Sequence, residues 1–127
     1  MDYRLEVVQV PVTDVDRAKA FYTEQAGFNA DHDTTVSDEM RVVQLTPPGS
    51  GCSIVIGTGL TKMKPGSIEG LQLVVSDIEA ARADLADRGV DVSDVRLLGP
   101  ADMDGSKFVM FSDPDGNGWA VQEFRGG

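Results

Sequence analysis

The hydrophobic residues of the chain follow two periods, one that fits strands and one that fits helices. Strand-like apolar runs occupy Leu5–Val10 and Leu71–Val75, and each run precedes a stretch in which apolar residues recur at helical spacing. The apolar face of the first helix is formed by Val15, Ala18, Phe21 and Tyr22, and that of the second by Ile78, Ala81 and Leu85. The pattern predicts a strand followed by a helix, twice along the chain.

Each predicted helix has a suitable residue at either end. Asp14 and Asp77 are expected as N-caps, because a carboxylate there accepts hydrogen bonds from the free amides of the first turn. Gly27 and Gly89 are expected as left-handed C-cap residues. Phe28 and Val90 follow them and are expected to open the next strands.

The rest of each half alternates short apolar runs with turns rich in Gly, Pro and Asp, which predicts further strands joined by tight connections. The expected strands are Val42–Leu45 and Ser53–Ile56 in the first half, and Phe108–Phe111 and Trp119–Phe124 in the second. The segment Leu98–Lys107 has the Gly and Pro content of a mobile loop.

The two halves also resemble each other in sequence. Residues 12–20 read VTDVDRAKA and residues 75–83 read VSDIEAARA, and a glutamine, Gln9 or Gln72, lies five residues before each capping aspartate. The duplication predicts an α+β fold of two tandem βαβββ modules, forming a cupped eight-stranded mixed sheet with helices on the outer faces. We expect one domain, with module one at about 1–58, a connector at about 59–68 and module two at about 69–127.

Composition narrows the class of protein and its partners. The 127 residues, 41% of them hydrophobic, suit one globular domain. The net charge is −10 and the 11 Lys and Arg residues are scattered, which disfavours nucleic acid and membrane surfaces as partners. No apolar run approaches a membrane span and no secretion signal opens the chain, so we expect a cytoplasmic protein. The single cysteine, Cys52, cannot form an intrachain disulfide and is expected as a small buried residue.

Three motifs together carry a family resemblance. They are DVDRAKAFY at 14–22, the Gly27-Phe28 pair, and SDPDGN at 112–117. Their order, spacing and duplication resemble the vicinal oxygen chelate superfamily, the group of glyoxalases, bleomycin-resistance proteins and extradiol dioxygenases. The resemblance spans nearly the whole chain. It implies a small-molecule pocket in the cup, with Leu98–Lys107 at its rim, and a homodimer in which the cup is often completed across the dimer.

The resemblance also locates where a metal would be held. Metal-dependent members use His, Glu or Gln from the first and last strand of each module. The matching positions here are Val7 and Gly70, seven residues before the capping aspartates, and Ser53 and Ala120 after the turns. A divalent metal needs several converging nitrogen or oxygen donors, and these residues do not supply them. We therefore expect no metal and no cofactor.

Strand alternation indicates what lines the cup instead. If Val7 and Gly70 face inward, alternation places Gln9 and Gln72 on the same face, although each amide could equally serve to bond neighbouring backbone. Glu6 and Glu123 are then expected on the opposite face, and the only histidine, His32, at an exposed position. Alternation does not settle the faces of Gln44 and Met110. The candidate ligand-binding residues are Gln9, Gln72, Gln44, Met110, Ser53, Val55, Gln122, Phe124 and Val7.

The favoured function is a metal-free protein that binds or sequesters an aromatic or antibiotic-like ligand, as in antibiotic resistance. One alternative is an enzyme of the superfamily, either a metal-dependent lyase, isomerase or dioxygenase, or a cofactor-free catalyst using a carboxylate such as Glu6 or Glu123. Another is an assembly subunit without a ligand. No catalytic residue is assigned.

Overall fold

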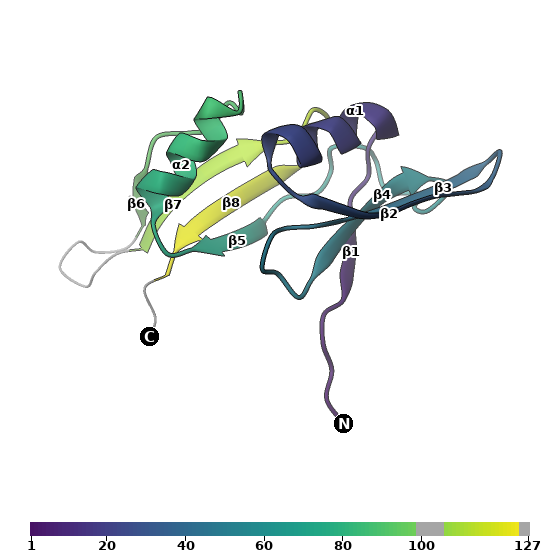
Figure 1. Cartoon of the computed structure of the whole chain (residues 1–127), viewed down its shortest axis with the longest axis horizontal. Helices are drawn as coiled ribbons and strands as arrows, with labels where there is room; N and C mark the ends of the chain where they lie inside the picture. The colour runs from purple at the N-terminus through teal and green to yellow at the C-terminus, as the bar shows by residue number, and fades with distance from the viewer. Residues whose placement is uncertain (99–105, 125–127) are drawn as a thin grey trace. The chain divides into compact units, whose positions relative to one another are not determined.

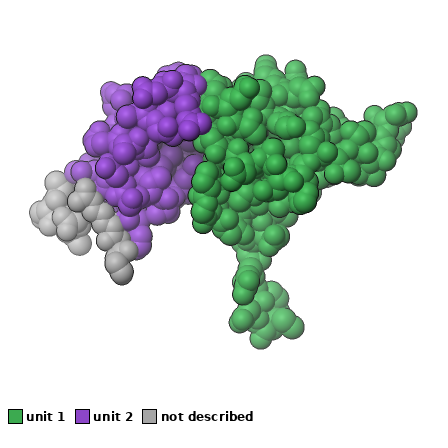
Figure 2. Space-filling view, in the orientation of Figure 1, with its two compact units in different colours: residues 1–68, 113–117 green, residues 69–112, 118–127 purple. Residues whose placement is uncertain are grey.

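The computed structural model describes residues 1–98 and 106–124 (Figure 1). It divides into two compact units: unit 1 contains residues 1–68 and 113–117, and unit 2 the described parts of 69–112 and 118–124 (Figure 2). Most of the expected loop Leu98–Lys107, namely residues 99–105, lies outside the described residues. None of the helices in the described ranges is long and apolar enough to span a membrane.

Unit 1 is a four-stranded sheet with one helix. Its elements in chain order are β1 (Val7–Gln9), α1 (Val15–Ala20), η1 (Phe21–Gln25), β2 (Asn29–Ser37), β3 (Met40–Thr46) and β4 (Ser53–Thr58). The strand order is β1-β4-β3-β2, with β1 parallel to β4 and the other pairs antiparallel. The α-helix continues into the π-helical turn η1, which buries the neighbouring side chains Phe21 and Tyr22 together.

Unit 2 repeats this plan. Its elements are β5 (Leu71–Val75), α2 (Ile78–Asp87), β6 (Arg96–Leu98), β7 (Ser106–Ser112) and β8 (Gly118–Glu123). The strand order is β5-β8-β7-β6, again with a parallel first pair and antiparallel pairs beyond it. Two four-stranded mixed sheets with one helix segment each confirm the predicted α+β fold class.

The predicted helix ends are confirmed. The Asp14 carboxylate accepts a hydrogen bond from the Arg17 amide at 3.0 Å, and that of Asp77 from the Ala80 amide at 3.1 Å. Gly27 and Gly89 both have the positive φ expected after a helix. The prediction for Val90 is wrong, because β6 spans only Arg96–Leu98. Val90 instead packs in the core of unit 2, and its amide donates to the Leu85 carbonyl.

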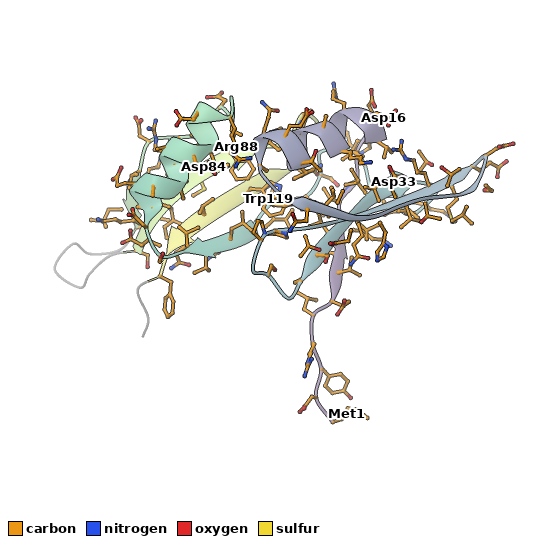
Figure 3. All side chains as sticks on the ribbon, in the orientation of Figure 1. Met1, Asp16, Asp33, Asp84, Arg88 and Trp119 are labelled. Atoms are coloured by element: carbon orange, nitrogen blue, oxygen red, sulfur yellow. The ribbon has the colours of Figure 1, made fainter. Side chains whose placement is uncertain are left out.

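In each unit the core lies between the helix and one face of the sheet. In unit 1 the buried strand residues on this face are Val43, Leu45, Ile54 and Ile56; in unit 2 they are Val109, Phe111, Trp119 and Val121. Each set alternates with partly exposed residues, so β3, β4, β7 and β8 each present every second side chain to the helix. Trp119, labelled in Figure 3, stacks on Phe111 with ring centroids 5.9 Å apart. The opposite face of each sheet, which carries no helix, is called its open face below.

The turn Asp113–Asn117 belongs to unit 1 and is held there by a buried polar cluster. The Asp113 carboxylate accepts hydrogen bonds from the Tyr22 hydroxyl and the Asn117 side-chain amide, both at 2.8 Å. It also accepts from the backbone amides of Asp115 and Asn117. Asn117 in turn donates to the Pro11 carbonyl at 2.8 Å. The SDPDGN motif is therefore a structural device that ties this turn to the helix segment of unit 1.

An ion-pair network joins α1 to the edge of the sheet in unit 1. Arg41 of β3 donates to both carboxylate oxygens of Asp33 on β2 and to Asp16 of α1, and Lys19 also donates to Asp33. Both aspartates are labelled in Figure 3. The hydrogen bonds from Arg41 and then from Lys19 hold the pKa of Asp33 well below its ordinary value.

Because of this network, the loss of stability caused by replacing Asp33 should depend on pH. Because the folded-state pKa of Asp33 is lowered, its stabilising contribution is present above the ordinary carboxyl pKa and is lost as the pH falls through the folded-state pKa. Asp33→Asn should lower the free energy of unfolding by about 1 kcal/mol at pH 7 and by progressively less in strong acid. Urea unfolding at pH 7, 4 and 2.5 checks this, with Asp38→Asn in the exposed β2–β3 turn as control. A loss that is the same at all three pH values would contradict it.

Candidate functional site

The open face of the unit 1 sheet combines amides, hydroxyls and apolar side chains. One row across the strands is formed by Gln9, Val55, Gln44 and His32, which are register partners in turn. Beside it, Val7 is the register partner of Ser53, whose hydroxyl lies 2.6 Å from that of Thr46. Gln44 donates to the Ser53 hydroxyl at 3.2 Å. This face can offer directed hydrogen bonds among apolar contacts.

The open face of the unit 2 sheet is more apolar. One row is formed by Gln72, Ala120 and Met110, and the next by Val74, Gln122, Phe108 and Arg96. The Gln72 side-chain amide donates to the Gln122 carbonyl oxygen, and Gln122 donates to the Ser106 hydroxyl at 3.1 Å. Two amides and a hydroxyl therefore form a chain across three strands, with apolar side chains on both sides of it.

The structure settles which face each candidate occupies. Of the nine predicted residues, all but Phe124 lie on strands with their side chains on an open face; Phe124 directly follows β8 and is exposed. Gln44 and Met110 join their open faces because their partners are Val55 and Ala120. Within unit 1 the structure brings Gln44 and Ser53 together, and within unit 2 Gln72 and Gln122.

Three residues of the unit 1 open face were missed from the sequence. His32 is the partner of Gln44, and Thr46 contacts both Ser53 and the Asp31 carboxylate. Alternation from Gln44 could have found Thr46. Asp31 could not be found in this way, because it is the extra residue where the β2–β3 register shifts between Ala30 and His32. His32 is exposed, as predicted, although its face depends on the same shift.

The residues at the metal positions that the family resemblance implies do not fit a divalent metal. Val7 is the register partner of Ser53, but Ala120 is the partner of Gln72, so the duplicated counterpart of Ala120 is Val55 rather than Ser53. With either residue, the set supplies at most one hydroxyl and no imidazole or carboxylate. In residues 1–98 and 106–124, no group of three or more His, Cys, Asp or Glu side chains could hold a metal ion.

Of the two carboxylates considered for catalysis, that of Glu123 lies away from the open faces. Glu123 alternates with Gln122, and its carboxylate accepts a hydrogen bond from the Ile78 amide at 3.0 Å, at the start of α2. Glu123 is therefore not placed to act as a general base on a ligand at an open face. Glu6 lies in the exposed segment that precedes β1.

Most of the chain matches one known protein family. Residues 4–121, from ahead of β1 into β8, match the family described as "Glyoxalase/Bleomycin resistance protein/Dioxygenase superfamily". The chain belongs to this superfamily. The resemblance seen in the sequence motifs is thereby confirmed over both halves of the chain.

Three individual proteins are similar to this chain over nearly its whole length. The uncharacterized protein YetH of Bacillus subtilis strain 168 is 30% identical over 124 residues, which cover 94% of this chain and 98% of YetH. The crystal structure of TnmS3, an antibiotic binding protein from Streptomyces sp. CB03234, is 34% identical, covers 96% of both chains and superimposes with a TM-score of 0.82. A glyoxalase/bleomycin resistance protein from the same organism is also 34% identical, with a TM-score of 0.78. The match covers 94% of this chain and 100% of that protein's chain.

Proposed function

We propose that this superfamily member binds an aromatic or antibiotic-like small molecule on its open faces, without a metal and without changing the ligand. The observation that carries the proposal is the composition of the open faces. At the metal positions that the family resemblance implies, this chain has Val7, Gly70 and Ala120, with Val55 as the register counterpart of Ala120 in place of the expected Ser53. Amides on neighbouring positions can orient a ligand's polar groups, while apolar side chains cover its rings.

Exposed apolar surface supports a binding role. Val7 is 41% exposed, Val74 is 59% exposed and Phe124 is 61% exposed, and all three belong to or adjoin an open face. Exposed apolar side chains that are surrounded by polar residues are typical of binding surfaces. TnmS3, an antibiotic binding protein, shares the fold and 34% of the sequence, which supports the same class of ligand here.

The remaining expectations belong to this proposal. We propose one domain with the module boundaries expected from the sequence, located in the cytoplasm and assembled as a homodimer. β1 is an edge strand of its sheet, and ahead of it Tyr3 and Leu5 expose large side chains on alternate residues (the segment ending at Met1 in Figure 3). An exposed edge with an apolar face is suited to pairing with a second chain.

Two results test this function: the ligand is recovered chemically unchanged, and the purified protein contains no bound metal. The protein should be purified without a nickel column or chelator, analysed for metals, and titrated by calorimetry with aromatic antibiotics in the presence and absence of EDTA. Calorimetry is preferable to tryptophan fluorescence, because Trp119 is buried on the helix side of its sheet.

We expect saturable binding that EDTA does not change, with the ligand recovered at its original mass. Stoichiometric zinc, iron, nickel or manganese, or conversion of the ligand, would instead favour the enzyme alternative. Failure of every compound to bind would favour an assembly role.

A further inference from the structure

Four side chains on the unit 1 open face form a hydrogen-bond chain in which the donor and the acceptor of each bond are fixed. The Thr46 hydroxyl donates to the Asp31 carboxylate, the hydroxyls of Thr46 and Ser53 lie 2.6 Å apart, and the Gln44 amide nitrogen donates to Ser53 at 3.2 Å. Ser53 is only 6% exposed, and Gln44 and Thr46 are half-buried. Only Asp31, at the outer end, is exposed.

The direction follows from the chemistry of the end group. An ionised carboxylate can only accept hydrogen bonds, so the single Thr46 proton goes to Asp31. Thr46 must then accept from Ser53, which uses the single Ser53 proton. Ser53 can therefore only accept from Gln44, so the amide nitrogen of Gln44 points to Ser53 and its carbonyl oxygen points away. The charge on Asp31 thus sets the orientation of an amide two side chains further on.

The duplicated sheet of unit 2 shows that the fold does not require this series of hydrogen bonds. In the matching register of unit 2, Met110 stands in place of Gln44, Ser112 in place of Thr46, and Gly118 in place of Ser53. The unit 2 chain from Gln72 through Gln122 to Ser106 ends on a hydroxyl that can both donate and accept, so nothing among these three groups fixes its direction. Of the two described open faces, that of unit 1 carries the directed hydrogen-bond chain and that of unit 2 does not.

We propose that this directed hydrogen-bond chain fixes the side-chain carbonyl oxygen of Gln44 as an acceptor pointing away from Ser53, so that the unit 1 open face prefers ligands carrying a hydroxyl or N–H donor, such as phenols, over ethers and carboxylates of the same shape. The inference rests on the proposed function, because it names the ligand chemistry of that surface. Neither an ether oxygen nor a carboxylate can donate to the Gln44 carbonyl, and a carboxylate would also be repelled by Asp31.

The test uses three probes with one ring system: 1-naphthol as donor, 1-methoxynaphthalene as acceptor and 1-naphthoate as anion. Each is titrated into the full chain while the Gln44 side-chain NH₂ signals are followed by NMR. The wild type should bind 1-naphthol about fivefold more tightly than 1-methoxynaphthalene, as one neutral hydrogen bond implies, and 1-naphthoate most weakly. Thr46→Val, which frees the Ser53 proton to turn toward the Gln44 carbonyl, should abolish that preference. Thr46→Ser, which keeps the hydroxyl, should retain it, and Asp31→Asn should weaken it.

A ligand-free measurement separates this inference from the proposed function. In the wild type, NOEs should connect the Gln44 NH₂ protons to the Ser53 β-protons, and they should weaken in Thr46→Val because the amide then adopts both orientations. Unchanged NOEs in that variant, or equal affinity of the wild type for the naphthol and its ether, would overturn the inference. If no probe binds while the NOEs behave as expected, the proposed function fails for aromatic ligands and the selectivity fails with it, but the direction of the chain stands.

Discussion

Replacing Asp113 with alanine should lower the free energy of unfolding by about 3–5 kcal/mol, the largest stability effect expected in unit 1. Asp113 is 5% exposed, and its carboxylate accepts four hydrogen bonds, from the Tyr22 hydroxyl, the Asn117 side chain and two backbone amides. Alanine removes the acceptor for all of them at once. Asn117, which is fully buried, would also lose part of the support that directs its amide toward Pro11.

Urea unfolding followed by circular dichroism measures this loss. Tyr22→Phe removes one of the four hydrogen bonds and should cost about 1 kcal/mol. Asp84→Ala is the matched control, because Asp84 is an exposed aspartate on α2 paired with Arg88 (Figure 3), and it should change stability by no more than about 0.5 kcal/mol. A loss below about 1 kcal/mol for Asp113→Ala would mean that the buried cluster does not hold the turn.

Replacing Ala120 with glutamate should weaken ligand binding by about a hundredfold or more, the largest functional effect expected. Ala120 lies half-buried on the unit 2 open face, between its partners Gln72 and Met110. A carboxylate there would have to lose water against the apolar surface of a bound ligand, which costs a few kcal/mol without a compensating partner. Because this face carries no helix, the folded structure should tolerate the substitution.

The control for this variant is the same change on the helix. Ala83→Glu introduces the charge at an exposed position of α2 and should leave affinity for the ligand unchanged. Both variants are compared by calorimetry with the aromatic compound identified in the titrations proposed above. If Ala120→Glu is folded and binds within about threefold of the wild type, the ligand does not occupy the unit 2 open face.

Features that depend on neighbouring residues could be predicted from the sequence. Asp14 and Asp77 were identified as caps because capping involves only the first turn of a helix. Gln9 and Gln72 were placed on the open faces because side-chain alternation holds within any single strand. Because the motif is duplicated, the order of strands and helix inferred for one half applied to the other half as well. The fold class was predictable for this reason.

Features that depend on distant partners could not be predicted. The first strand was expected over Leu5–Val10 but spans Val7–Gln9, because only these residues are register partners of β4. The face of Gln44 follows from its pairing with Val55, and the contact of Asp31 with Thr46 follows from a shift in strand register. Cys52 was expected to be buried and is half-buried beside a turn. The first three of these cases are decided by strand pairing, on which a single segment carries no information.

Mapping a bound ligand onto the sheets tests the central claim most directly. Backbone amide spectra of the full chain should be recorded with EDTA present, with and without the aromatic compound that binds most tightly. The account predicts saturable shifts concentrated at open-face positions, including Gln9, Val55, Gln72 and Ala120, and the same shifts without EDTA. Shifts confined to the helix-facing side of the sheets, or binding that appears only after a divalent metal is added, would contradict it.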